Sequence, residues 1–353
     1  MRVHQEELAY ARAYEASQPF ESLSEAQLQS IRGRGRELFT WFKAHPRTHN
    51  AINALAITFL FVADVAILTR LPLVWLTPGQ PVGWAPLLLA ALVVGTLHSY
   101  LLYSLVVFGL HEAAAHNIVF VGKGPLARAG QAFARHMGRI AGGEPNDYSR
   151  THMAHHARFG TDEDAEFLNS VFLRRYALTF LPLAGFLNFS DFVVHRPLTY
   201  TRSRLVSAAL ASAYQGLFAW LSYQQFGGAY TVIVFLVCLP HVGFYLDRVR
   251  QFTEHNLMPL DNANGSRSFG LGFWGMLVGG GPWGSPCHWE HHLVPSLPWY
   301  QQLLLHRHVT GLLTPAQRRQ FLVTPVVGFP AMWWRLVRHM GRRPLTLPES
   351  PRP

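Results

Sequence analysis

The chain has 353 residues, of which 14% are charged, against roughly 25% in ordinary globular proteins. Its 30 Lys and Arg outnumber its 20 Asp and Glu and give a net charge of +10. So little charge with so strong a bias in sign argues against an ordinary soluble domain and against a nucleic-acid partner, and favours an integral membrane protein whose basic residues face one side.

Residues 1–50 carry charges throughout and contain no apolar signal segment, so we expect cytoplasmic or interfacial N-terminal helices there. Apolar runs without Lys or Arg follow at residues 51–69 and 86–110. Each is close to the roughly 20 residues that a membrane-spanning helix needs. These two runs predict a hairpin of spanning helices.

A second pair of apolar runs covers residues 205–223 and 229–247 and is joined by a short QQFGG turn. Four spans return the chain to the side on which it started. The apolar stretch 176–194 is interrupted by proline, glycine and polar residues, so we expect an interfacial or re-entrant helix there rather than a fifth span.

The basic residues orient these spans. Of the 30 Lys and Arg, only Arg70 lies in the two short loops at 70–85 and 224–228. Basic loops stay on the cytoplasmic side, so we expect a multi-pass protein with both termini and the segment 111–204 in the cytoplasm.

Nine of the 19 histidines follow a regular pattern in these cytoplasmic stretches. HEAAAH comes directly after the second predicted span, HMAHH and HWEHH share the spacing H-x-x-H-H, and one further histidine follows the fourth predicted span. On a helix, the histidines of H-x-x-H-H fall within an arc of about 100° and can point at one centre. The candidate metal ligands are His111, His116, His152, His155, His156, His255, His288, His291 and His292.

The two histidines of HEAAAH differ by about 140° on an ideal α-helix, so they would serve different metals or lie where the helix end unwinds. Imidazole suits iron, zinc, copper and nickel, and nine imidazoles exceed what one ion can use, so the pattern predicts two metal ions. Haem ligation by His98 and His241, inside the predicted spans, is an alternative. A non-catalytic metal-binding or transport protein is another, but it would be expected to carry histidine runs within one loop.

The segments HEAAAH, HMAHHARFGTDEDAE and CHWEHHLVPSLPWYQ resemble the three histidine boxes of the membrane fatty acid desaturase family, which are integral membrane di-iron oxidases. The resemblance covers about residues 51–305. It implies an all-α membrane and catalytic domain over this range, with four transmembrane helices in two hairpins and a cytoplasmic helical cap that holds a di-iron site. Residues 306–353 would then be a cytoplasmic C-terminal extension.

The resemblance also implies roles for two residues near the end of the fourth span. The first box is similar to that of stearoyl-CoA desaturases, in which a histidine beyond the fourth span completes the metal shell, and His255 matches it by position. In those enzymes an asparagine one helical turn earlier reaches the metal through water. Here Gln251 stands in its place and departs from that pattern.

Side chains that bond to metal-bound imidazoles should fix their orientation. The acidic candidates for this role are Glu112, Asp162, Asp164, Glu166, Glu254 and Glu290. The guanidinium fork of arginine matches phosphate and carboxylate groups, and the candidates for binding a substrate headgroup are Arg150, Arg158 and Arg267.

The resemblance implies an enzyme that uses two Fe ions and O2 to introduce a double bond into a lipid acyl chain. A hydroxylase or ketolase acting on lipids, sphingoid bases or carotenoids would carry the same boxes, so this alternative stays open. The chain has no haem-binding HPGG motif and no C-x-x-C pair. Electrons are therefore expected from a separate protein, such as a ferredoxin or a cytochrome b5-like carrier.

Overall fold

The computed structural model describes residues 20–161, 163–164, 201–256 and 258–340. Within these residues the chain is helical and forms no strand, apart from an isolated β-bridge between Ser268 and Leu322. The all-helical prediction is thus confirmed. The predicted re-entrant helix at 176–194 lies outside the described residues.

The chain divides into two compact units, each assembled from separate stretches of sequence. Unit 1 comprises residues 1–39, 151–178 and 248–353, and unit 2 comprises residues 40–150 and 179–247. Helices that continue across the boundaries are α2 (Glu25–Ala44), α6 (Pro145–Arg158) and α11 (Leu239–His255).

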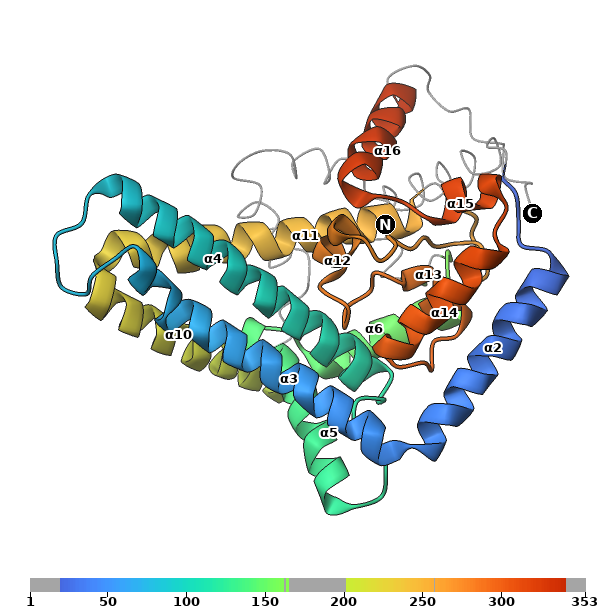
Figure 1. The fold of residues 1–353 in the computed structure, drawn as a ribbon, viewed down its shortest axis with the longest axis horizontal. Coiled ribbons are helices and arrows are strands. Elements are labelled where there is room, and N and C mark those ends of the chain that lie inside the picture. Colours follow the sequence, from blue (N-terminus) through green and yellow to red (C-terminus); the bar gives the residue numbers. More distant parts are fainter. Residues whose placement is uncertain (1–19, 162, 165–200, 257, 341–353) are drawn as a thin grey trace. The chain divides into compact units, whose positions relative to one another are not determined.

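Unit 2 contains the first two of the long apolar helical runs and most of the third. Figure 1 shows its helices along the chain. Its elements are α3 (Pro46–Thr69), the 3-10 helix η1 (Leu71–Val74), α4 (Trp84–Val107), the π-helix η2 (Phe108–Ala115), α5 (Pro125–Met137), the 3-10 helix η3 (Gly138–Ala141), α10 (Arg202–Thr231) and the π-helix η4 (Val232–Cys238). A proline opens both α3 and α5, at a position where its missing N–H would have no partner within the helix.

Three helical runs among the described residues are long and apolar enough to cross a membrane, namely Pro46–Thr69, Trp84–Ala115 and Arg202–His255. The first two contain the predicted spans 51–69 and 86–110. The third has 54 residues and would measure about 80 Å as one straight helix, far more than the roughly 30 Å hydrocarbon core.

Gly227 interrupts this long run with φ 83° and ψ 178°, a conformation that is essentially restricted to glycine. It lies within the predicted QQFGG turn. The π-helix η4, which follows the turn, packs against α10, so the chain reverses direction at Gly227 (Figure 1).

The helix α4 approaches η4 closely because a small residue lies at their contact. A Cβ atom built on Gly95 would lie 2.6 Å from Cβ of Cys238, so no larger side chain fits there without displacing η4. The core of unit 2 around these helices consists of Leu68, Leu76, Ala90, Ala91, Val94, Phe218, Tyr230, Val234 and Phe235.

A buried polar network joins three of these helices. Asp64 on α3 and His98 on α4 are fully buried, with Oδ1 of Asp64 2.7 Å from Nδ1 of His98. From α10, the hydroxyl of Tyr214 donates to Oδ2 of Asp64 at 2.6 Å, and Oε1 of Gln215 lies 3.0 Å from Nε2 of His98. Both ring nitrogens of His98 are engaged by side chains, which leaves neither for a haem iron. Such groups are costly to bury in a membrane unless they are paired.

Unit 1 has a separate helical core. Besides parts of α2, α6 and α11, it contains α12 (Phe273–Gly279), α13 (His288–Leu293), α14 (Trp299–Leu312), α15 (Pro315–Phe321) and α16 (Pro325–Met340). Trp289 of α13 is completely buried and stacks on Phe321 of α15, with ring centroids 3.9 Å apart. This stack holds α13, which carries the third histidine group, against α15.

Replacing Asp64 tests the network in unit 2. We expect Asp64→Ala to lower the free energy of unfolding by about 3–5 kcal/mol, because His98 loses the partner that compensates for its burial. Asp64→Ala/His98→Leu should recover part of that loss. Thermal unfolding in detergent measures both variants. If Asp64→Ala lost no more stability than Val62→Ala, at an exposed position of the same helix, the network would not contribute as described.

Candidate metal centre

The first histidine group lies in a π-helix. The N–H of His116 bonds the carbonyl of His111, five residues earlier, at 3.2 Å. An i→i+5 bond brings residues five apart over one another, as an i→i+4 bond does for residues four apart. The two imidazole rings accordingly have centroids 5.0 Å apart. The 140° of an ideal α-helix does not apply to this stretch because η2 is wound more widely than an α-helix, so the helix end is irregular, as one of the two alternatives from the sequence has it.

The second and third groups lie on α6 and α13. At the start of α6 the carboxylate of Glu144 accepts the N–H of Asp147 at 2.6 Å and caps the helix. This helix carries HMAHH toward its C-terminal end, whereas all of HWEHH lies in α13 and is buried. Each H-x-x-H-H pattern is therefore helical, as the spacing predicts.

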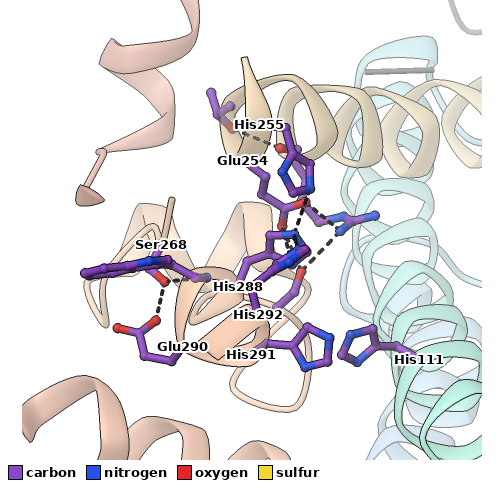
Figure 2. Close-up of polar contacts among 12 residues, drawn as sticks. His111, Glu254, His255, Ser268, His288, Glu290, His291 and His292 are labelled. Atoms are coloured by element: carbon purple, nitrogen blue, oxygen red, sulfur yellow. Dashed lines mark hydrogen bonds and ion pairs between the residues drawn. The ribbon is translucent and has the colours of Figure 1, made fainter. Parts of the chain in front are cut away.

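Four histidines of unit 1 converge on one point. His155 on α6, His255 at the end of α11, and His288 and His292 on α13 each offer a ring nitrogen, and these atoms all lie within 4.8 Å of one another. All four side chains are buried. The Nε2 atoms are 2.9 Å apart between His255 and His288 and 3.1 Å apart between His288 and His292 (Figure 2). They are 3.3 Å apart between His155 and His292.

These separations fit a shared metal ion better than a set of hydrogen bonds. Nδ1 of His155 faces the carboxylate of Asp164, and Nδ1 of His255 faces the carbonyl oxygen of Gly265 at 3.2 Å. The proton of each neutral ring therefore belongs on Nδ1, and the Nε2 lone pair points into the cluster. Facing lone pairs repel unless a cation lies between them. Two nitrogens bound to one metal at about 2.1 Å lie about 3.0–3.4 Å apart, close to the separations observed.

Three further histidines of unit 1 form a second group. Nε2 of His156 lies 2.7 Å from Nε2 of His291 and 3.1 Å from Nε2 of His152. The amide of Gln302, which donates to the carbonyl of Leu297 at 2.8 Å, lies 3.5 Å from Nδ1 of His291. This group repeats the facing-nitrogen geometry of the first, so it could also hold a cation.

Two predicted carboxylates contact the outer nitrogen of a predicted ligand directly. Both oxygens of Asp164 lie 2.9 Å from Nδ1 of His155. In unit 2, Oε1 of Glu112 lies 3.2 Å from Nδ1 of His111. Contacts of this kind fix the orientation of a ligating imidazole and leave its other nitrogen free for a metal.

A third carboxylate, Glu254, is held by residues that the sequence pattern did not single out. Arg250 donates to its Oε2 at 2.8 Å and the hydroxyl of Ser285 donates to its Oε1 at 3.1 Å. Oε1 also lies 3.6 Å from Nδ1 of His288. The i,i+4 spacing of Arg250 and Glu254 on α11 is a signal that could have found Arg250, whereas Ser285 leaves no such signal.

Burial is the main influence on the protonation of His288. Desolvation, reinforced by the neighbouring His292 and His255, lowers the pKa of His288 well below its ordinary value. The ring is therefore neutral at pH 7, which is the form that binds a metal.

The remaining candidates for contacts around the ligands are placed differently. Glu290 points away from the converging histidines and accepts the hydroxyl of Ser268 (Figure 2). It also bonds to His306. Gln251 is half-buried and lies one turn before His255 on α11. Asp162 and Glu166 are outside the described residues.

The three predicted headgroup arginines have different surroundings. The side chains of Arg150 and Arg158 are 76% and 58% exposed, and each pairs with a neighbouring carboxylate. Arg267 is buried, and its guanidinium donates to backbone carbonyls, including two near the end of α11. Only the first two arginines therefore present their guanidinium groups to solvent.

A family model for the fatty acid desaturases matches residues 82–324. The matched stretch contains all nine candidate histidines. Neither the comparison with curated proteins nor the comparison with solved structures finds a match.

Neutralising Asp164 tests its contact with His155. We expect Asp164→Asn to weaken metal binding roughly 10- to 100-fold, because an amide holds the Nδ1 proton of the imidazole less firmly than a carboxylate does. Competition with a chelator measures the affinity. The control is Glu163→Gln, which neutralises the adjacent exposed carboxylate. Equal affinities in the two variants would show that Asp164 does not orient a ligand.

Shortening η2 tests the π-helical spacing. Deleting Ala114 would leave His111 and the second histidine of the box four residues apart, on one face of an ordinary α-helix. We expect this variant to retain at least about half of the bound metal, whereas inserting an alanine after Ala114 should remove more. Metal content per chain is the measurement. A higher metal content in the insertion variant than in the deletion variant would contradict this role of the π-helix.

Proposed function

Because the chain belongs to the fatty acid desaturase family, we propose that it is an O2-dependent di-iron membrane oxidase that introduces a double bond into a fatty acyl chain. Family membership alone implies an oxidoreductase of the desaturase or hydroxylase type. The observation that carries the proposal is the convergence of His155, His255, His288 and His292.

The donor set supports iron as the metal. The facing nitrogens are all imidazole, a ligand that suits iron, and two groups of them support two ions. We assign one iron to the converging group of four and the second to His152, His156 and His291. The family pattern in the sequence makes His111 and His116 its further ligands. When bound, the iron pair would supply, with O2 and two electrons, the oxidation that removes hydrogen from an unactivated methylene.

The protein's own contribution is to hold the imidazoles and to keep water away. Asp164 and the carbonyl of Gly265 fix the outer nitrogens of His155 and His255, and the carboxylate of Glu254 lies 3.6 Å from the outer nitrogen of His288. Burial of the ligands around them limits access of water, which would otherwise quench a strong oxidant.

Four membrane crossings would bring the lipid substrate to this chemistry. We assign two of them to the long run Arg202–His255, which reverses direction at Gly227. Because α4 continues directly into η2, an acyl chain beside α4 in the bilayer would be led toward His111. Four crossings and the distribution of Lys and Arg together favour a cytoplasmic location for the histidine groups and both termini.

The net charge of +10 favours an acidic electron carrier, such as a ferredoxin or a cytochrome b5-like protein, as the partner. The exposed guanidinium groups of Arg150 and Arg158 remain candidates for binding the substrate headgroup.

Removal of single ligands tests the proposal. We expect two irons per wild-type chain, with the loss of about one iron and of oxidase activity in His155→Ala and in His292→Ala. His136→Ala, at an exposed histidine outside the pattern, is the control and should resemble the wild type. Wild-type protein with less than about one iron per chain, or full activity in the two ligand variants, would contradict the proposal.

Product mass separates the two reactions of the family. Expression in a host with a simple lipid profile, followed by mass spectrometry, should show the loss of two hydrogens from an acyl chain. A gain of oxygen would instead show a hydroxylase or ketolase.

A further inference from the structure

The face of α13 opposite its metal-binding histidines carries a second buried network. Oε1 of Glu290 lies 2.6 Å from Nδ1 of His306 on α14, and its Oε2 accepts the hydroxyl of Ser268 (Figure 2). The same hydroxyl oxygen accepts the N–H of Trp289 at 3.0 Å. Glu290, Ser268 and His306 are 0%, 0% and 5% exposed, so this network is shielded from water.

The network connects α13 to two other parts of unit 1. Ser268 is fixed by its backbone, because its N–H bonds the carbonyl of Phe321 at 2.9 Å and its carbonyl accepts the N–H of Val323 at 3.0 Å. His306 belongs to α14, which has 14 residues, whereas α13 has 6. A helix as short as α13 has little stability of its own, so contacts with its surroundings must set its rotation.

Glu290 favours the protonated form of His306. Burial alone would lower the pKa of His306, but the charge of Glu290 and the hydrogen bond between them raise it above its ordinary value. An imidazolium held against a carboxylate fixes both side chains more firmly than a neutral hydrogen bond would.

Glu290 lies about 150° around the helix from the centre of the arc formed by His288, His291 and His292. A bond that holds Glu290 in place therefore also sets the direction of the three histidines. We propose that His306 is a positioning residue for the metal centre: through Glu290, with Ser268 as the second anchor, it fixes the rotation of α13. This inference rests on the proposed function.

The same place offers a competing interpretation, a third metal ion bound by Cys287, Glu290 and His306, whose ligand atoms lie within 4.8 Å of one another. One observation favours the positioning network: both oxygens of Glu290 are already bonded within it.

The test titrates the full chain in detergent with Co²⁺. The absorption of the bound ion reports its surroundings, and competition with a chelator measures the affinity. We expect His306→Ala to weaken Co²⁺ binding about tenfold and to shift the absorption bands. His306→Asn should restore both properties, because its amide nitrogen can occupy the place of Nδ1 and donate to Glu290. Ser268→Ala, which removes the other anchor, should act in the same direction as His306→Ala.

The control His308→Asn changes the next histidine on the same helix, which bonds Ser30 instead, and should leave the affinity and the spectrum as in the wild type. If His306→Ala fails to fold, Ser268→Ala compared with His308→Asn decides the question.

Wild-type spectra and affinity in His306→Ala and Ser268→Ala would overturn the positioning role alone. Loss of one bound metal in Cys287→Ala would replace it with the third metal site. Wild-type protein that binds no Co²⁺ and no iron would overturn this inference and the proposed function together.

Discussion

The structure of unit 1 depends on four imidazoles that face one another, an arrangement that a cation between them would stabilise. His155, His255, His288 and His292 come from three helices that are far apart in the sequence, and a ring nitrogen of each nevertheless lies within 4.8 Å of the others. Neutral imidazoles whose outer nitrogens carry the proton would repel one another at such distances. A bound metal converts this repulsion into ligation and joins α6, α11 and α13, so metal binding and the folding of this part of the chain should be coupled.

The need to direct one nitrogen of each imidazole at the centre also explains which residues surround the candidate ligands. A metal-binding nitrogen is available only if the other nitrogen of the ring keeps its proton, and Asp164 and the carbonyl of Gly265 provide acceptors for that proton. Glu254 is in turn held by Arg250 and Ser285. Glu290 lies on the far face of α13 and bonds away from the centre. Glu254 and Glu290 each stand next to a candidate ligand in the sequence, but only Glu254 faces the outer nitrogen of one.

Sequence reasoning succeeded where local spacing determines the geometry. The H-x-x-H-H groups are helical, the first two apolar runs form long helices, and the turn at Gly227 lies where its two glycines suggested it. For HEAAAH the sequence left two alternatives open, because the angle of an ideal α-helix does not hold in a π-helix. Ser285 and His306 could not be found, since their roles depend on contacts with residues 31 and 16 positions away. The direction of Glu290 likewise depends on how α13 packs, which periodicity alone does not determine.

The central claim, that imidazole nitrogen alone holds two irons, is tested most directly by iron analysis combined with iron-edge X-ray absorption of the purified wild-type protein. We predict two irons per chain, an inner shell of nitrogen at about 2.0–2.2 Å and the outer scattering of imidazole rings. An inner shell containing sulfur, or iron bound without imidazole scattering, would contradict the claim.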